Sequence, residues 1–299
     1  MKFVKMQGCG NDYIYIKEEE LLKIPEAEWV RYVRFLCDRH FGVGADGVIV
    51  IRTLDGIAAD FEMLVYNADG SRAGMCGNGI LCVGRYVYEQ GLTGKKELRI
   101  ASGGIIRRVW LYPDSASTVR VNMGKPEFLC TKIPVIFPKS KMIGEVVEFG
   151  ETHYFMTCVS MGNPHAVVVM TPEQVTALHV PGEPLISIRK LLLQLPYDVQ
   201  KEGTMLERAD IFPEKTNVEF VCPVDAHNIC MRVWERGSGE TYSCGTGSCA
   251  ASAACMINGL TKNEVTVTLL GGTLYVEWDR EADEMYLTGP ADTVYRGEI

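Results

Sequence analysis

The chain has 299 residues, of which 47% are hydrophobic and 23% charged, which suits one large or two ordinary globular domains. Its formal net charge of -8 argues against a nucleic-acid partner, because phosphate binding needs clustered lysines and arginines. A small acidic ligand needs only one or two local donors and stays compatible with this charge. No apolar run is long enough for a membrane span or a signal sequence. We therefore expect a cytoplasmic protein with no membrane partner.

The cysteine pattern favours free thiols. The 11 cysteines are an odd number and include no C-x-x-C pair, which is typical of reduced cytosolic thiols rather than of a disulfide framework. The clustered cysteines are spaced more widely than the ligands of tetrahedral zinc sites. Because no nucleotide-binding fingerprint occurs either, we expect neither a metal nor a cofactor.

Two segments in the first half of the chain recur in the second. GNDYIYI, which begins at Gly10, resembles GNPHAVVV, which begins at Gly162. The predicted strand GVIVI at 47–51 resembles NVEFV at 217–221. Both matches occur in the same order along the chain.

A third match carries the chemistry. Residues 63–79, MLVYNADGSRAGMCGNG, align without a gap on residues 231–247, MRVWERGSGETYSCGTG. In this alignment Cys76 meets Cys244, and the flanking glycines coincide. Three matches in register predict a duplicated domain.

Each half predicts a strand, a glycine-rich turn and then a helix of small residues. The two helices are predicted over 77–90 and 245–258. A glycine follows each of them, Gly91 and Gly259, where a left-handed residue commonly ends a helix. A further helix is predicted over 186–195. Further strands are predicted at 105–112, 119–124, 264–270, 273–278 and 284–289.

Cys76 and Cys244 each stand directly before a predicted helix. Unpaired N–H groups and the helix dipole at such a position favour a thiolate, and the same groups can hold a substrate carboxylate. A pseudo-twofold axis between the halves would bring both thiols to one cleft. One thiolate and one thiol could then remove a proton from one face of a carbon and deliver a proton to the other. The N–H groups would stabilise the carbanion, so the pair indicates inversion of an amino-acid stereocentre without pyridoxal phosphate.

Other functions fit less of the pattern. A single cysteine before a helix is more often a packing residue, but duplication alone does not explain why both halves keep a thiol in a glycine-rich turn. A cysteine nucleophile assisted by His165, in a hydrolase or a thiol sensor, leaves the second thiol unexplained. A non-enzymatic binding module gives the paired thiols no task.

Eight blocks of the sequence resemble diaminopimelate epimerases over essentially the full chain, in the order of that family. They are KMQGCGNDY (5–13), RHFGVGADG (39–47), YNADGS (66–71), MCGNG (75–79), VSMGNPH (159–165), PEKTNVEFV (213–221), ERGSGET (235–241) and CGTG (244–247). The two cysteine turns together with ERGSGET are the most specific part of the resemblance.

The resemblance implies an α/β (α+β) fold. Its two pseudo-symmetric lobes would each consist of a curled mixed or antiparallel sheet wrapped around a central helix. We expect the N-terminal lobe, which carries Cys76, to comprise 1–122 plus 284–299. The C-terminal lobe, which carries Cys244, would comprise 123–283.

The resemblance also implies the site. Cys76 and Cys244 would form the acid–base pair, while His165 and Glu235 would set thiol protonation and help to orient the ammonium group. The implied substrate-binding residues are Asn11 at the reacting end, Gly77, Asn78, Gly245 and Thr246 around the reacting carboxylate, and Asn67, Asn163, Asn217 and Arg236 at the distal amino and carboxylate groups. Judged one at a time, Asn67 and Asn163 are more typical of turn residues. Glu235 and Arg236 are more typical of a solvated ion pair.

The implied reaction is the epimerisation of LL-2,6-diaminopimelate to the meso form, in lysine and peptidoglycan precursor biosynthesis. A small amino-acid substrate and a homodimer are the accompanying expectations. The chain departs from the family at Gln7, where the family commonly has His, and at Gly47, Gly74 and Leu81, where polar or charged side chains are frequent. These departures keep open a racemase of another amino acid, such as histidine, with the same two-cysteine chemistry.

Overall fold

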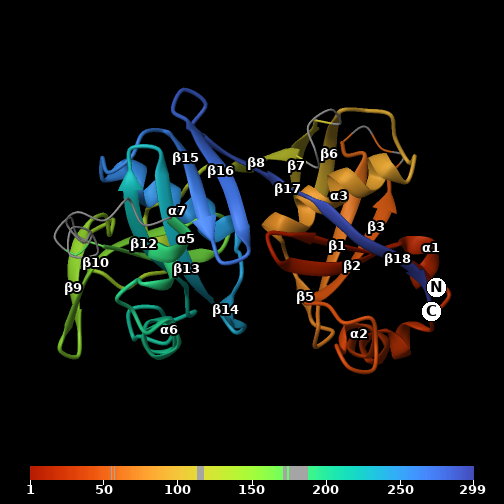
Figure 1. Cartoon of the computed structure of the whole chain (residues 1–299), viewed down its shortest axis with the longest axis horizontal. Coiled ribbons are helices and arrows are strands. Elements are labelled where there is room, and N and C mark those ends of the chain that lie inside the picture. The colour runs from red at the N-terminus through yellow and green to blue at the C-terminus, as the bar shows by residue number, and fades with distance from the viewer. Residues whose placement is uncertain (55, 57, 113–117, 171–173, 175–187) are drawn as a thin grey trace. The chain divides into compact units, whose positions relative to one another are not determined.

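The computed structural model describes residues 1–54, 56, 58–112, 118–170, 174 and 188–299 (Figure 1). The chain divides into unit 1, Met1–Asn122 with Thr288–Ile299, and unit 2, Met123–Leu287. It passes from unit 1 to unit 2 within β8 (Thr118–Gly124) and returns within β17 (Glu284–Pro290).

Unit 1 is a strand-rich body with one long helix. Its strands are β1 (Lys2–Gly8), β2 (Asn11–Lys17), β3 (Gly47–Thr53), β4 (Phe61–Asn67), β5 (Arg72–Ala73), β6 (Glu97–Ser102), β7 (Ile105–Leu111) and β18 (Asp292–Glu298). Its helices are α1 (Glu18–Leu21), η1 (Glu26–Glu28), α2 (Trp29–Cys37) and α3 (Gly77–Glu89). The strands β2 and β3 are parallel, β3 and β4 antiparallel, β4 and β6 parallel, and β6 and β7 antiparallel. The terminal strands β1 and β18 pair antiparallel, so both chain ends lie in this unit.

Unit 2 repeats this order. Its strands are β9 (Glu145–Phe149), β10 (Thr152–Ser160), β11 (Pro164–Val169), β12 (Asn217–Asp225), β13 (Asn228–Glu235), β14 (Gly239–Thr241), β15 (Glu264–Leu269) and β16 (Gly272–Asp279). Its helices are η2 (Cys130–Lys132), α5 (Ile188–Leu193), α6 (Val199–Glu207) and α7 (Gly245–Ile257). Here β11 and β12 are parallel, β12 and β13 antiparallel, β13 and β15 parallel, and β15 and β16 antiparallel. Two units with one pattern of pairing are what the internal repeat predicts.

The two long helices end in the same way. Each has 13 residues and stops one residue before its predicted end. Beyond α3, Gly91 has a left-handed φ of 66°, and the Leu92 N–H donates to the Val87 carbonyl at 2.9 Å. Beyond α7, Gly259 has a φ of 71°, and the equivalent hydrogen bonds close the helix. These are the bonds of a Schellman motif, and they confirm the helix-stop role of both glycines.

Small side chains make α7 a core helix. Every residue from Gly245 to Met256 is buried, and the helix packs against β10, β11, β12, β13, β15 and β16. The run is mostly Gly, Ala, Ser and Cys, which lets strands approach on all sides; a helix without a polar face is normally buried in this way. In unit 1, α3 packs against β1, β2 and β7.

The fold class is confirmed as a strand-rich α+β architecture with curled sheets. The five further predicted strands are also confirmed, as β7, β8, β15, β16 and β17. The helix predicted over 186–195 corresponds to α5, and its first two residues lie outside the described part of the chain. Within that described part, no helix is both long and apolar enough to cross a membrane.

The left-handed glycine after α3 gives a stability prediction. Replacing Gly91 by Ala should lower the free energy of unfolding by about 1 kcal/mol, because a Cβ disfavours positive φ although nothing lies within 4 Å of its position. Urea unfolding measures the change. Gly94→Ala is the matched control, since Gly94 also has open space but no left-handed φ. Equal effects of the two substitutions would contradict the assignment.

Candidate functional site

Both long helices begin at a cysteine. Cys76 and Cys244 are the N-cap residues of α3 and α7, with extended φ and ψ of -133° and 113° in one case and -132° and 116° in the other. The sulfur accepts the backbone N–H of the residue three positions on, from Gly79 at 3.2 Å and from Gly247 at 3.3 Å. Sulfur thus takes the place that a serine or threonine oxygen usually has at an N-cap. The prediction that each thiol stands at a helix start is confirmed.

In each unit the glycine three residues after the cysteine, Gly79 or Gly247, is closely packed. A Cβ on Gly79 would lie 3.1 Å from the Cys76 sulfur, and a Cβ on Gly247 would lie 3.3 Å from the Cys244 sulfur. A strand also approaches each position from the other side. The glycines therefore allow sulfur, helix and strand to meet.

The half-site of unit 1 joins Cys76 to Asn11. The Cys76 thiol, which is half-buried, donates to the Asn11 Oδ1 at 3.4 Å. The Asn11 Nδ2 donates to the Asp46 Oδ2 at 3.0 Å. Because Asp46 takes the amide nitrogen, the amide oxygen of Asn11 is turned toward the sulfur.

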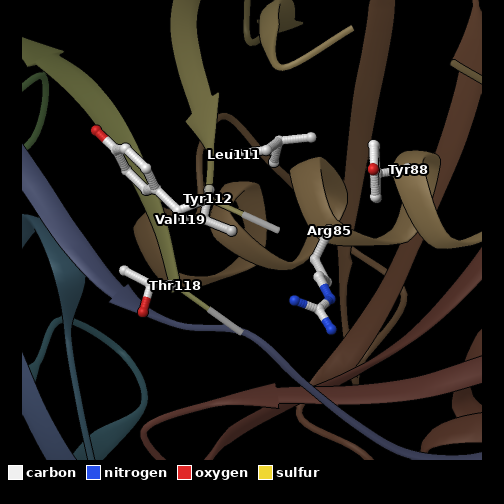
Figure 2. Close-up of a pocket in the computed structure, with 6 residues that line it drawn as sticks. All are labelled: Arg85, Tyr88, Leu111, Tyr112, Thr118 and Val119. Atoms are coloured by element: carbon white, nitrogen blue, oxygen red, sulfur yellow. The ribbon is translucent and has the colours of Figure 1, made fainter. Parts of the chain in front are cut away.

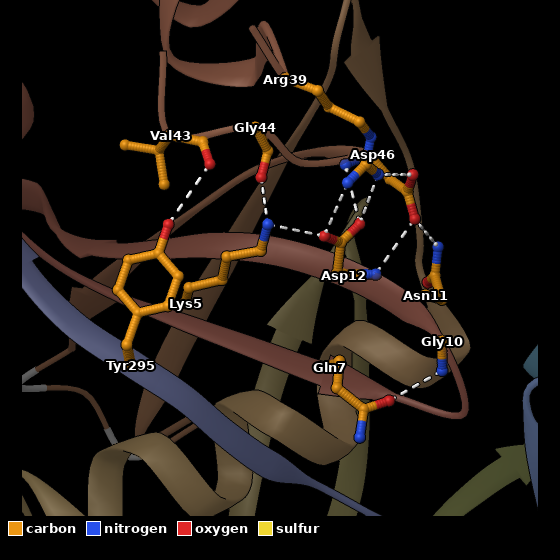
Figure 3. Close-up of polar contacts among 10 residues, drawn as sticks. All are labelled: Lys5, Gln7, Gly10, Asn11, Asp12, Arg39, Val43, Gly44, Asp46 and Tyr295. Atoms are coloured by element: carbon orange, nitrogen blue, oxygen red, sulfur yellow. Dashed lines mark hydrogen bonds and ion pairs between the residues drawn. The ribbon is translucent and has the colours of Figure 1, made fainter.

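A network of charged groups supports this orientation (Figure 3). Arg39 contacts Asp12 at 2.7 Å and Asp46 at 2.9 Å, and Lys5 contacts Asp12 at 2.8 Å. Burial alone would raise the pKa of Asp12, but the hydrogen bonds and charges of Arg39 and Lys5 outweigh burial and lower it. Burial raises the pKa of Asp46, and neighbouring Asp12 adds to that effect. The aspartates thus hold the Asn11 segment through paired charges.

Two family departures have a structural basis in unit 1. The Gln7 Oε1 accepts the Gly10 N–H at 2.7 Å and its Nε2 donates to Asp292 at 3.0 Å, so Gln7 braces the turn before Asn11 (Figure 3). A Cβ at Gly47 would lie 2.6 Å from the Tyr13 ring. The same Cβ would lie closer still to the Tyr66 backbone carbonyl, so the Tyr66 backbone and the Tyr13 ring leave no space for a side chain at position 47.

The half-site of unit 2 is a chain of polar contacts that ends at Cys244. The Cys244 sulfur lies 3.4 Å from the Thr246 hydroxyl, which accepts from the Asn163 Nδ2 at 3.3 Å. The Asn163 Oδ1 lies 3.1 Å from the His165 Nε2, and the His165 Nδ1 lies 2.7 Å from the Glu219 carboxylate. Four predicted site residues are thereby brought together, and Glu219 joins them.

The expectation that both helix starts acidify their thiols is wrong for Cys244. Burial raises the pKa of this thiol well above its usual range, and the Glu235 and Glu219 carboxylates add to the effect. Hydrogen bonds from Thr246 and from the Gly247 N–H act in the opposite direction but are outweighed. Cys244 is therefore protonated at neutral pH.

Glu235 lies beside Cys244, as predicted. It is half-buried, and the Thr241 hydroxyl donates to its Oε1 at 2.6 Å. Burial raises the pKa of Glu235, while hydrogen bonds from Thr241 and from the Cys244 thiol lower it in part.

Two predicted residues at the distal end of the site contact each other. Asn217, which is buried, donates to the Pro164 carbonyl at 2.8 Å and accepts the backbone N–H of Arg236 at 2.9 Å. The Arg236 guanidinium is exposed and donates to the Glu214 carbonyl at 2.9 Å. Asn217 thereby fixes the backbone from which Arg236 projects.

The first turns of both helices are buried at Gly77, Asn78, Gly245 and Thr246. Asn67 is exposed, and its Nδ2 donates to the Ser71 hydroxyl at 2.9 Å within a tight turn, which is the turn role that its sequence context favours. Its part in substrate binding stays a prediction.

Sequence reasoning missed two contributors, Asp46 and Glu219. Glu219 is fully buried, and the available signal was a single carboxylate in the middle of the apolar strand NVEFV. Asp46 lies in the RHFGVGADG block, which was noted only for resemblance. Both act through a neighbour, so neither forms a motif of its own.

One depression of the described chain lies apart from these residues. A depression in unit 1 is lined by Arg85, Tyr88, Leu111, Tyr112, Thr118 and Val119 (Figure 2). Over the residues that the structure describes, no three His, Cys, Asp or Glu side chains gather into a metal-binding group.

Comparison with known proteins gives one consistent result. The family described as diaminopimelate epimerase matches residues 3–129 and 157–294. Relatives named diaminopimelate epimerase from Agathobacter rectalis and Methanococcus maripaludis are 43% and 41% identical, each over 100% of this chain and 99% of its own length.

Solved structures share the fold at low identity. A phenazine biosynthesis protein of Bacillus anthracis aligns with a TM-score of 0.65 at 16% identity, over 100% of this chain and 98% of its own. A hydroxyproline epimerase from Agrobacterium vitis aligns with a TM-score of 0.64 at 14% identity, over 99% of this chain and 91% of its own.

The charged network of unit 1 predicts a pH-dependent stability. Because the pKa of Asp12 is lowered in the folded chain, its stabilising effect is present above its unfolded pKa of about 4 and is lost as pH falls through the folded value. Asp12→Asn should lower the free energy of unfolding by about 2 kcal/mol at pH 7, with a smaller difference from the parent chain in acid. Urea unfolding at pH 7 and at successively lower pH measures this.

Glu97→Gln is the control for Asp12→Asn. It removes the 3.0 Å pair with Arg108, in which both side chains are more than half exposed, and should change stability by less than about 1 kcal/mol. A constant deficit of Asp12→Asn at every pH would refute the charge-based explanation.

Proposed function

Because this chain belongs to the diaminopimelate epimerase family of isomerases, we propose that it converts LL-2,6-diaminopimelate into the meso form with two cysteines and no cofactor. The reaction would serve the biosynthesis of lysine and peptidoglycan precursors. The observation that carries the proposal is the matched pair of N-cap cysteines, Cys76 and Cys244, with nearly identical backbone angles.

The proposed step is a proton exchange at one carbon. Cys76 would first lose to solvent the proton that it donates to the Asn11 Oδ1. As the thiolate it takes the α-proton, and the electron pair of the broken C–H bond stays on the α-carbon and its carboxylate. The Cys244 thiol delivers a proton to the opposite face, which forms the new C–H bond. Cys76 then carries the proton and Cys244 is the thiolate, so the reverse reaction uses the two groups in exchanged roles.

The protonation state of Cys244, in the half-site of unit 2, supports these roles. Cys244 is buried beside two carboxylates that favour its thiol form, as a proton donor requires. Backbone N–H groups in the first turns of α3 and α7 would hold the substrate carboxylate where charge develops. The reaction would need no cofactor to stabilise this charge.

The distal end of the substrate would be recognised by Asn67, Asn163, Asn217 and Arg236. An arginine fork can hold a carboxylate through two parallel hydrogen bonds. The exposed guanidinium of Arg236, projecting from a backbone that Asn217 fixes, supports that role. A homodimer and a cytoplasmic location stay predictions.

Removing either sulfur tests the two-base mechanism. Cys76→Ala and Cys244→Ala should each lower kcat for diaminopimelate epimerisation by about 10²- to 10⁴-fold, because each deletes one proton-transfer group. In D₂O the parent enzyme should place deuterium at the α-carbon during turnover, as mass spectrometry can detect. Cys82→Ala on α3 and Cys255→Ala on α7 are controls from the same helices and should stay active. Near-normal turnover in either site variant would rule out the mechanism.

Substitution of Arg236 tests the substrate. Arg236→Lys should raise KM for diaminopimelate by about tenfold or more, because a point charge replaces the bidentate fork. Arg232→Lys changes the same residue type on β13, the strand that ends directly before Arg236. Arg232 pairs with Glu240 at 2.6 Å, and its substitution should leave KM unchanged. A panel of L-amino acids in D₂O completes the test. Rapid exchange of histidine with no exchange of diaminopimelate would favour the racemase alternative.

A further inference from the structure

The two half-sites differ at one buried position beside the sulfur. A Cβ on Gly79 would lie 2.7 Å from the Ile49 side chain, and a Cβ on Gly247 would lie 2.7 Å from the Glu219 Oε1. Ile49 on β3 and Glu219 on β12 occupy the same place in the aligned strands GVIVI and NVEFV. Unit 1 therefore places a hydrocarbon against the first turn of its helix, whereas unit 2 places a carboxylate there.

The strands that pair with β3 and β12, which are β2 and β11, also carry different side chains at equivalent positions. Tyr13 on β2 lies opposite Gly47 in a parallel pair, and His165 on β11 lies opposite Asn217 in the equivalent parallel pair. In unit 2 the imidazole and the Glu219 carboxylate contact each other at 2.7 Å, and both side chains are fully buried. At these aligned positions the repeated backbone thus carries a buried ionisable pair in unit 2, and Tyr13 and Ile49 in unit 1.

The hydrogen bonds around His165 determine where its protons lie. Asn163 donates through Nδ2 to Thr246, so its Oδ1 accepts from the imidazole and the His165 Nε2 carries a hydrogen. The His165 Nδ1 and Glu219 then share one proton between them. The second oxygen of Glu219 is buried with no hydrogen-bond partner in the described chain. Burial raises the pKa of this carboxyl, and the charge and hydrogen bond of His165 act in the opposite direction and favour the carboxylate.

Cys244 is surrounded by ionisable groups from three strands. They are Glu219 on β12, Glu235 on β13 and His165 on β11. From β10 the Cys158 thiol faces Glu219, whose charge contributes to raising the pKa of that thiol, after burial. Carboxylates close to a thiol disfavour its thiolate. At Cys244 the effect of Glu235 is the larger and that of Glu219 comes next, and the Glu219 Oε1 is the oxygen that packs against Gly247 in the first turn of α7.

We propose that Glu219, held by His165 against the first turn of α7, is a positioning residue that keeps the proton on Cys244 while Cys76 serves as the base. The inference rests on the proposed function and deepens it. Helix starts of equal geometry would give both sulfurs the same preference for proton or charge. The carboxylate in unit 2 breaks that equivalence, so Cys244 keeps its proton over a wider range of pH, and Cys76 is the sulfur that gives up its proton to become the base.

Glu219→Gln is the direct test. The amide keeps the shape and can donate to the His165 Nδ1, but it removes the charge beside the sulfur. The basic limb of the pH profile of kcat/KM, where the second thiol ionises, should move to lower pH by about one unit. Glu202→Gln is the matched control, because Glu202 is a half-buried carboxylate of the same unit that bonds to Tyr154 at 2.7 Å. It should leave the profile unchanged.

A second readout does not depend on the substrate. Alkylation of Cys244 by iodoacetamide, measured by mass spectrometry of the peptide that carries it, should have a midpoint above pH 9 in the parent chain. That midpoint should fall by about one unit in Glu219→Gln and stay in place in Glu202→Gln. If circular dichroism shows that Glu219→Gln does not fold, Glu219→Ile introduces the residue of unit 1 and should shift the midpoint in the same direction.

The outcomes separate the two proposals. An unshifted midpoint in a folded Glu219 variant overturns the inference, whatever happens to the rate. Lost activity with an unshifted midpoint also overturns it, since Glu219 would then have only a packing role. A shifted midpoint in a chain whose parent form does not epimerise diaminopimelate supports the role of Glu219 and refutes the proposed function instead.

Discussion

A cysteine sulfur that caps a helix is the constraint on which the rest of this structure depends. To accept the N–H three residues on, Cys76 and Cys244 must be extended while the following residues turn into the helix. That geometry crowds the third turn position, which only glycine can occupy, at Gly79 and Gly247. One hydrogen bond therefore fixes the position of each thiol relative to the first turn of its helix.

The same backbone supports two electrostatic environments. The field of a helix N-terminus stabilises a negative charge by about 0.3–1 kcal/mol, which is less than the free energy of one pKa unit, about 1.4 kcal/mol. Burial can shift a pKa by as much as 3–5 units. At Cys244 burial and two carboxylates act together against the helix, so the thiol form prevails. In unit 1, Cys76 is half-buried and contacts an amide oxygen. The difference arises from side chains on the surrounding strands, because the helix starts themselves are alike.

Fold similarity by itself carries little of the functional argument. A phenazine biosynthesis protein and a hydroxyproline epimerase share the fold at 16% and 14% identity, and one fold can carry several activities. The site is distinguished from those of other proteins with this fold by side chains whose orientation is fixed by hydrogen bonds. Asp46 turns the Asn11 amide toward one sulfur, and His165 turns the Asn163 amide toward Thr246 beside the other. In each unit a side chain behind an asparagine fixes which end of its amide turns toward the cysteine, in unit 1, or toward the threonine beside the cysteine, in unit 2.

The repeat, the two helices with their glycine stops, most strands and the residues at each helix start could all be predicted from the amino-acid sequence. These features depend on local spacing: glycine after a helix, small residues within it and cysteine before it act over a few positions. The protonation of Cys244 and the parts played by Asp46 and Glu219 follow from three-dimensional packing. Glu219 lies 25 positions before Cys244 in the chain, and parallel pairing of β11 with β12 brings it to His165. A pKa depends on burial and on charges contributed by several strands, and a linear pattern does not contain those distances.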